Sequence, residues 1–179
     1  MSLTLATLIP GLLMLAFGAA LFSGRATVTA SLKAFPRSTT AAVVLFGGGA
    51  IWFLYKVWHL PESDFGQYRV ILAIVFGAIA VLSFKYVPDF LAVRGLAVLI
   101  LLSASPLLDA AYMHYDQPQR LFMVSLVYLC IALAIYLGAS PYRLRDLFEW
   151  LFRAPGRVRV LGAVFAGYGL LLTIVAFTY

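Results

Sequence analysis

The chain has too few charged residues to cover the surface of a water-soluble protein. Lysine, arginine, aspartate and glutamate make up 11% of its 179 residues, whereas soluble domains carry about a quarter. Hydrophobic residues make up 64%, so much of the folded surface must be apolar. This composition excludes an ordinary soluble domain and favours a protein that folds in a membrane.

Cysteine, histidine and acidic residues are also scarce. The single cysteine, Cys130, excludes an intrachain disulfide and a metal site built from several thiolates. No nucleophile–base pair, phosphate-binding glycine loop or nucleotide motif accompanies the two histidines and seven carboxylates. We therefore expect no catalytic residues and no metal site, and the sequence identifies no cofactor.

Long apolar runs are what the sequence has in abundance. A bilayer core about 30 Å thick needs about 20 apolar residues in a helix, and six runs reach or approach that length. They cover residues 3–22, 41–58, 70–87, 95–113, 121–139 and 160–179. Ten-residue segments of alternating polarity, typical of a membrane barrel, are absent. The predicted fold is all-α, a polytopic membrane protein with six transmembrane helices.

Basic residues gather in the turns after the first, third and fifth runs. These turns hold ten of the thirteen lysines and arginines, a bias that marks the cytoplasmic side. We therefore expect both termini on the non-cytoplasmic side of a bacterial inner membrane. The residues are Arg25, Lys33, Arg37, Lys85, Arg94, Arg143, Arg145, Arg153, Arg157 and Arg159. All except Lys85 are predicted to contact anionic lipid head groups, and no module typical of nucleic-acid binding accompanies them.

Two of the basic turns, residues 23–40 and 140–159, are long enough to contain helices. In the first, Val28, Leu32 and Phe35 recur at helical spacing on one face. An apolar stripe of the same kind runs through the second. We predict an amphipathic helix on the membrane surface in each of these two turns.

The second surface helix should carry ion pairs along its polar side. Glu149 lies four residues after Arg145 and four before Arg153, a spacing at which side chains on one helix meet. We expect Pro36 and Pro155 to end the two surface helices, because the residue before a proline avoids the helical conformation.

The six spans are expected to form one domain of three tandem helical hairpins, covering residues 1–58, 68–113 and 119–179. A shift of 120 positions aligns the first hairpin with the third, with nine identical residues over 37 positions. The identities include Arg25/Arg145, Arg37/Arg157, Gly47/Gly167 and Gly49/Gly169. We interpret the third hairpin as a duplicate of the first, in the same orientation.

Glycines give two of the spans small faces. Small residues let helix backbones approach closely in lipid, where packing drives association. The residues predicted to pack helices are Gly47, Gly48, Gly49, Gly162, Gly167 and Gly169. Room for a pigment or a lipid tail is the alternative, but glycine is common in such spans and packing is favoured.

One span carries a polar cluster of Ser103, Ser105, Pro106 and Asp109. Ser105 and Asp109 are four residues apart and share a helix face, and Pro106 removes a backbone donor. A carboxylate inside a membrane suggests transport or proton handling. Asp109 lies only about 6 Å from the end of its span, however, so a structural position at the interface is favoured.

Both histidines fall in the turns expected on the non-cytoplasmic side, together with several acids. Histidine and carboxylates could bind a divalent metal or relay protons. These residues come from two loops without a tight ligand spacing, so ordinary solvated loops are the favoured interpretation.

Three functions are compatible with the sequence. We favour a non-enzymatic membrane subunit that stabilises or tethers partner subunits, because no span carries a deep charge and no soluble domain is present. The first alternative is a small transporter or channel that uses Asp109 and a kink at Pro106. The second is a membrane enzyme that handles lipids or quinones. Membrane lipids and other membrane-protein subunits are the expected partners.

Overall fold

The structure, a computed structural model, describes all 179 residues and is helical almost throughout. It contains 83% helix and no strand, and six of its helices are long and apolar enough to cross a membrane. The prediction of a multi-pass helical membrane protein is confirmed at this level. Five spans are single helices: α1 (Leu3–Phe22), α5 (Arg69–Tyr86), α6 (Leu91–Ala111), α7 (Arg120–Ala139) and α9 (Pro155–Ala176).

The remaining span, Thr39–Trp58, contains a wide turn. It is built from α3 (Thr39–Ala42), the π-helical η2 (Val43–Gly47) and α4 (Gly48–Trp58). A π-helical turn of this kind is uncommon inside an α-helix. The shorter elements are α2 (Ala26–Ala34), η1 (Phe35–Arg37), η3 (Glu62–Asp64), η4 (Gly66–Tyr68) and α8 (Tyr142–Leu151).

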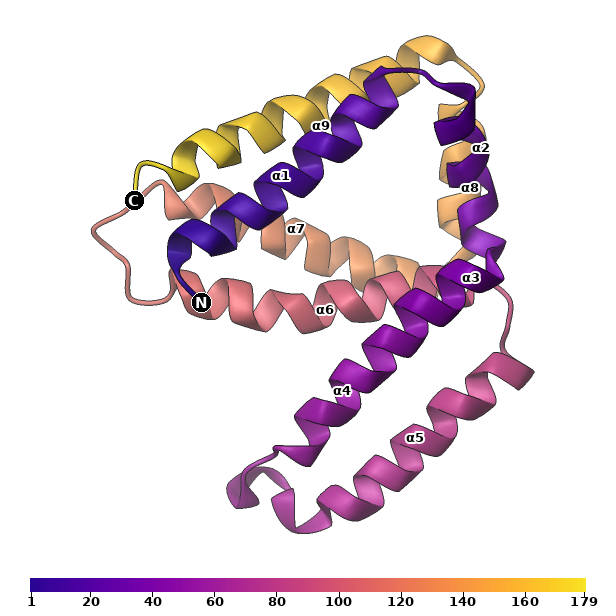
Figure 1. Cartoon of the computed structure of the whole chain (residues 1–179), viewed down its shortest axis with the longest axis vertical. Coiled ribbons are helices and arrows are strands. Elements are labelled where there is room, and N and C mark those ends of the chain that lie inside the picture. Colours follow the sequence, from indigo (N-terminus) through magenta and orange to yellow (C-terminus); the bar gives the residue numbers. More distant parts are fainter.

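All six spans run between two ends of the molecule (Figure 1). One end, called here the terminal end, holds both chain termini and the α4–α5 and α6–α7 loops. The other, called the basic end, holds α2, α8 and the α5–α6 turn. The chain therefore alternates between the two ends in the order that the six apolar runs predict.

The closest helix pairs are not the predicted hairpins. The main antiparallel contacts are α1 along α9, α6 along α7, and α4 along α5 (Figure 1). The helices of the first predicted hairpin are held apart at the basic end by α2, a helix of nine residues and therefore about 14 Å long. The short loops at the terminal end and the meeting of the first and last spans therefore decide which helices pack together.

The turns 23–40 and 140–159 both contain the helix that the sequence predicts there, α2 in the first and α8 in the second. In α8, Leu144 and Leu151 are buried, and Arg145 lies 3.7 Å from Glu149 in the expected i,i+4 pair. The expected pair between Glu149 and Arg153 does not form, because α8 ends at Leu151 and Arg153 lies beyond it.

Two spans begin earlier than their apolar runs. Helix α6 begins at Leu91, four residues before the predicted start, so Arg94 lies in its first turn. Helix α9 begins at Pro155, five residues early, because a proline fits the first position of a helix, where its missing N–H is not needed. Arginines near the start of each span, such as Arg94 in α6 and Arg157 in α9, therefore end the apolar run but not the helix.

Most of the apolar surface faces outward. Only 30 of 179 residues are buried, and α5 contains no buried residue. Its side chains Ile74 and Val81 are 67% and 71% exposed. Soluble proteins rarely show apolar surfaces of this extent, whereas hydrocarbon surrounds them without cost. The exposure agrees with an integral membrane protein.

The core lies at the terminal end, where α1, α6, α7 and α9 converge. It includes the buried side chains of Leu3, Met123 and Leu172. Arg120 closes the α6–α7 connection there, since its Nη1 donates a hydrogen bond of 2.7 Å to the carbonyl of Ala111. This bond satisfies one of the carbonyls that the end of a helix leaves free.

Candidate functional site

Reciprocal glycines carry the contact between α1 and α9. A Cβ added to Gly18 would lie 2.7 Å from the carbonyl oxygen of Gly162, and a Cβ on Gly162 would lie 2.9 Å from the carbonyl oxygen of Gly18. A Cβ on Gly169 would lie 2.7 Å from the carbonyl oxygen of Gly11 and 2.4 Å from the backbone nitrogen of Leu15. The two backbones are therefore in direct contact, as small residues allow in membranes.

Gly162 and Gly169, two of the glycines predicted to pack helices, lie at this contact, and the prediction missed their partners. Gly11 and Gly18 are seven residues apart in α1, and Gly162 and Gly169 are seven apart in α9. Residues seven apart lie on nearly the same face, two turns along a helix. This matched spacing is the signal in the sequence that identifies the partners.

A second close contact joins α6 to the span that contains the π-helical turn. A Cβ on Gly95 would lie 2.4 Å from the backbone nitrogen of Phe46, which belongs to η2. Gly49 lies against the side chain of Val98, with its added Cβ 3.1 Å from Val98 Cγ1. Gly49, one of the glycines predicted to pack helices, thus lies at this contact, and Gly95 was missed because it stands alone in its span.

Gly47, Gly48 and Gly167, also predicted to pack helices, make no close contact within this chain. A Cβ added at any of these three positions meets no atom within 4 Å. Successive residues of a helix point about 100° apart, so glycines one or two positions from a packed one face elsewhere. These three glycines are on outward faces of their spans.

Ser105 and Asp109 share a helix face, as predicted. The hydroxyl of Ser105 donates a hydrogen bond of 3.3 Å to Asp109 Oδ2, and both side chains are exposed. Asp109 stands two residues before the end of α6. Neither residue lines any of the four main cavities between the helices.

The histidines and acids of the terminal end do not converge. The structure brings no three histidine, cysteine or acidic side chains together in a metal-binding arrangement. His59 Nδ1 instead lies 2.8 Å from the carbonyl oxygen of Tyr55, in the preceding turn of its own helix.

The basic end carries nearly all of its positive charge without acidic partners. Both ion pairs of the structure belong to Arg145, which lies 2.8 Å from Asp146 and 3.7 Å from Glu149. The hydrogen bond from Arg145 to Asp146, with the negative charges nearby, raises the pKa of this guanidinium above its ordinary value. Arg145 therefore has less need of an external anion than the other arginines predicted to bind head groups.

Aromatic rings orient several of the remaining cations. The Arg157 guanidinium lies 4.4 Å from the centre of the Trp150 ring and donates a hydrogen bond of 2.9 Å to the Trp150 carbonyl. Lys33 lies 5.6 Å from the Phe152 ring, and Arg37 lies 5.5 Å from the Phe90 ring. Such stacking leaves the edges of a guanidinium free to bind an anion. Arg25, Arg94, Arg143, Arg153 and Arg159 also lie at this end of the molecule.

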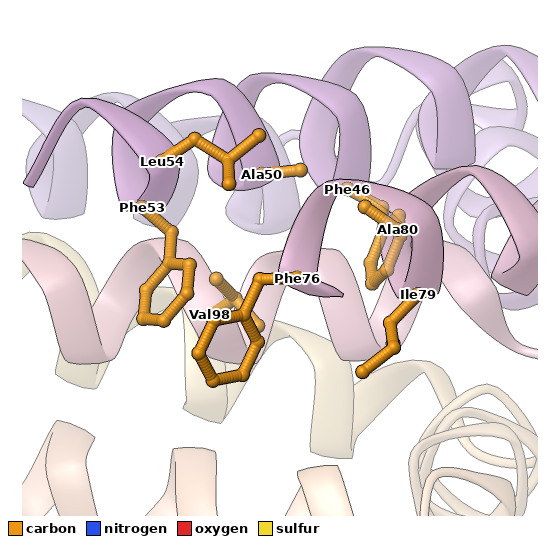
Figure 2. Close-up of a pocket in the computed structure, with 8 residues that line it drawn as sticks. All are labelled: Phe46, Ala50, Phe53, Leu54, Phe76, Ile79, Ala80 and Val98. Carbon is orange, nitrogen blue, oxygen red and sulfur yellow. The ribbon is translucent and has the colours of Figure 1, made fainter. Parts of the chain in front are cut away.

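Two apolar cavities open between the spans. One of about 210 Å³ lies between α4, α5 and α6 and is lined only by hydrophobic residues; Figure 2 shows their side chains converging from the three helices. The other, of about 340 Å³, lies between α1, α4, α6 and α7, and its lining includes Pro10, Pro106 and Cys130. Neither cavity was predicted from the sequence, because each combines residues from distant parts of the chain.

Comparison of the chain with protein-family models, with curated proteins and with solved structures finds no match.

Proposed function

We propose that this chain is a non-enzymatic integral membrane subunit that packs against partner subunits and stabilises them in a larger complex. The observation that carries the proposal is the state of α5. This helix packs along α4 and buries none of its 18 residues. An apolar helix attached on one side only offers its other sides to lipid or to partner helices. The outward glycines Gly47, Gly48 and Gly167 provide further surfaces where a partner backbone can approach closely.

The cavities support a structural function over transport. An ion or polar solute needs polar groups along its path, and such groups are what line transport pathways in membranes. Here the cavity of about 210 Å³ and a further one of about 120 Å³ next to Leu133 have entirely hydrophobic linings. In the cavity of about 340 Å³ the single polar side chain is that of Ser103. The intramembrane carboxylate Asp109 faces outward, away from them.

Gentle extraction from the membrane tests the proposal. A tagged chain purified in a mild detergent should bring other membrane proteins with it in fixed stoichiometry. Substitution of leucine for Gly48 should lower their recovery while the chain itself stays folded, because Gly48 meets nothing within this chain. Recovery of a single species containing this chain alone would contradict the proposal.

Ser105 and Asp109 provide the specific observation behind a second function, ion or proton transport. Within the six spans, this is the one hydrogen bond between side chains in which a carboxylate takes part. If the protein is structural, Asp109→Asn should change flux in reconstituted vesicles by less than twofold and leave assembly intact. Loss of flux with normal assembly would favour the transporter instead.

The orientation proposed from the basic residues has its own test. We propose that the basic end faces the cytoplasm and that the termini lie on the non-cytoplasmic side of a bacterial inner membrane, following the bias of lysine and arginine. A cysteine-reactive label that does not cross membranes should then react, in intact cells, with cysteine-containing tags attached at Met1 and Tyr179. A tag inserted at Glu149 should react only after the cells are opened, and the reverse pattern would overturn the orientation.

We also propose that the third hairpin is a duplicate of the first. Two pairs of glycines 120 positions apart support the proposal: Gly49 and Gly169 both contact a neighbouring helix, whereas Gly47 and Gly167 both face outward. The repeat would also explain why the first and third of the basic turns each contain a short helix before the next span.

A further inference from the structure

Two cavities lie in line within the wedge formed by the span Thr39–Trp58, α5 and α6. The apolar cavity of about 210 Å³ is lined by Phe46, Ala80 and Val98, among others (Figure 2). A smaller cavity of about 60 Å³ lies nearer the basic end and is lined by residues of the same three elements, of η1 and of the α5–α6 turn. The wedge therefore has an apolar part and a separate part next to the basic end.

The two cavities follow each other along the helices. Ala42 lines the smaller cavity, and Phe46, one turn further along the same span, lines the apolar one. On α5, Phe84 lines the smaller cavity and Ala80, one turn away, lines the apolar one. The rings of Phe46 and Phe84 meet edge to face at 5.5 Å between centres, at the junction of the two cavities. An elongated molecule that occupies both cavities must therefore displace this ring pair or pass beside it.

The smaller cavity is polar and positively charged. Its lining includes Arg37, Ser38 and Thr39 and contains no acidic residue. Arg37 has no carboxylate partner, since both ion pairs of the structure involve Arg145. Its guanidinium is held 5.5 Å from the Phe90 ring, an arrangement that leaves its donors free for a phosphate. The charge of this cavity is complementary to an anion.

The apolar cavity is a slot between three helices, lined by eight hydrophobic residues. A flexible hydrocarbon chain suits such a slot, and the bilayer supplies one at this depth. Because the slot lies next to a basic cavity, an anionic lipid matches it better than an apolar partner helix does.

We propose that the wedge holds one anionic phospholipid, with its phosphate at Arg37, Ser38 and Thr39 and an acyl chain between α4, α5 and α6. Such a lipid would fasten α5, which buries no residue of its own, to the rest of the molecule. The inference does not depend on partner subunits, because every residue in it belongs to this chain.

The head-group part is tested by lipid binding to the purified full chain in detergent. Native mass spectrometry should show one bound phosphatidylglycerol, several-fold more than phosphatidylcholine at equal concentration, and no bound glycerol phosphate. Arg37→Gln should weaken phosphatidylglycerol binding about fivefold, since one arginine near an anionic lipid contributes about that much. Arg25→Gln removes the same charge from the other end of α2 and should leave binding within twofold.

The tail part is tested by filling the slot. Ala80→Phe places a ring among the lining residues and should abolish the bound lipid, whereas Ala78→Phe, on the exposed side of the same helix, should not. Retention of lipid by Ala80→Phe, or equal loss in Arg37→Gln and Arg25→Gln, would overturn the proposal. So would a lipid-free protein that forms a dimer through α5. Binding of glycerol phosphate alone would show a phosphate site without a lipid.

Discussion

Replacing Gly169 with leucine should separate α1 from α9. The added Cβ would lie 2.4 Å from the backbone nitrogen of Leu15, so the two helices must move apart before the side chain fits. Overpacking of this kind costs about 1–3 kcal/mol and more when backbone must move. We expect a loss at or above the top of that range in the free energy of unfolding, measured by denaturant titration in mixed micelles.

Gly167→Leu provides the matched control for this prediction. Gly167 belongs to the same helix, two residues away, and an added Cβ there meets no atom within 4 Å. Its substitution should change the free energy of unfolding by less than about 0.5 kcal/mol. Equal destabilisation by the two variants would show that the α1–α9 contact does not hold the first and last spans together.

Leucine at Gly95 should detach the span Thr39–Trp58 from α6. The added Cβ would lie 2.4 Å from the backbone nitrogen of Phe46. Cysteines introduced at Gly49 and Val98 can report the separation of the two spans. A Cβ added at Gly49 lies 3.6 Å from Val98 Cβ, within the range of about 3.5–4.5 Å that a disulfide needs. With Cys130→Ser as background, Gly49→Cys and Val98→Cys should form a disulfide in high yield, and adding Gly95→Leu should lower that yield at least fivefold.

The control pair uses the neighbouring glycine. Gly48 faces open space, so Gly48→Cys with Val98→Cys should form little disulfide under the same oxidising conditions. If both pairs react equally, the two spans are not held in the described register. If Gly95→Leu leaves the first pair fully oxidised, Gly95 is not the point of close approach.

The number and position of the spans could be predicted from sequence because they depend on local composition. A run of about 20 apolar residues spans a bilayer whatever it packs against, and all six predicted runs coincide with long helices. Their starts were less accurate. Arg94 and Pro155 interrupt a hydropathy pattern, yet both lie within the first turns of helices.

The pairing of the spans could not be predicted in the same way. Hydropathy describes each helix as if it were alone, and the contact of α1 with α9 depends on which faces meet. Gly47 and Gly49 are two residues apart and about 200° apart around the helix. Gly49 therefore packs against Val98, while Gly47 faces outward. Composition alone cannot distinguish them.

The polar cluster was easier to predict than the lipid site. Ser105 and Asp109 lie on one helix, where a spacing of four places them side by side, and they do form a hydrogen bond. The wedge combines Arg37 with side chains from α5 and α6. Arg37 was predicted to contact lipid head groups, but the slot beside it exists only after three separate elements have come together.

The contact between the first and last spans has a consequence for biosynthesis. Helix α1 leaves the ribosome first, and its partner α9 begins about 130 residues later. At roughly 5–20 residues per second, the nascent chain waits on the order of 10 s before this partner exists. During that interval, the glycine face of α1 has only lipid or the insertion machinery to contact. The α1–α9 contact therefore cannot form in the order of synthesis, and the glycine face of α1 must remain in the membrane without its partner until α9 has been made.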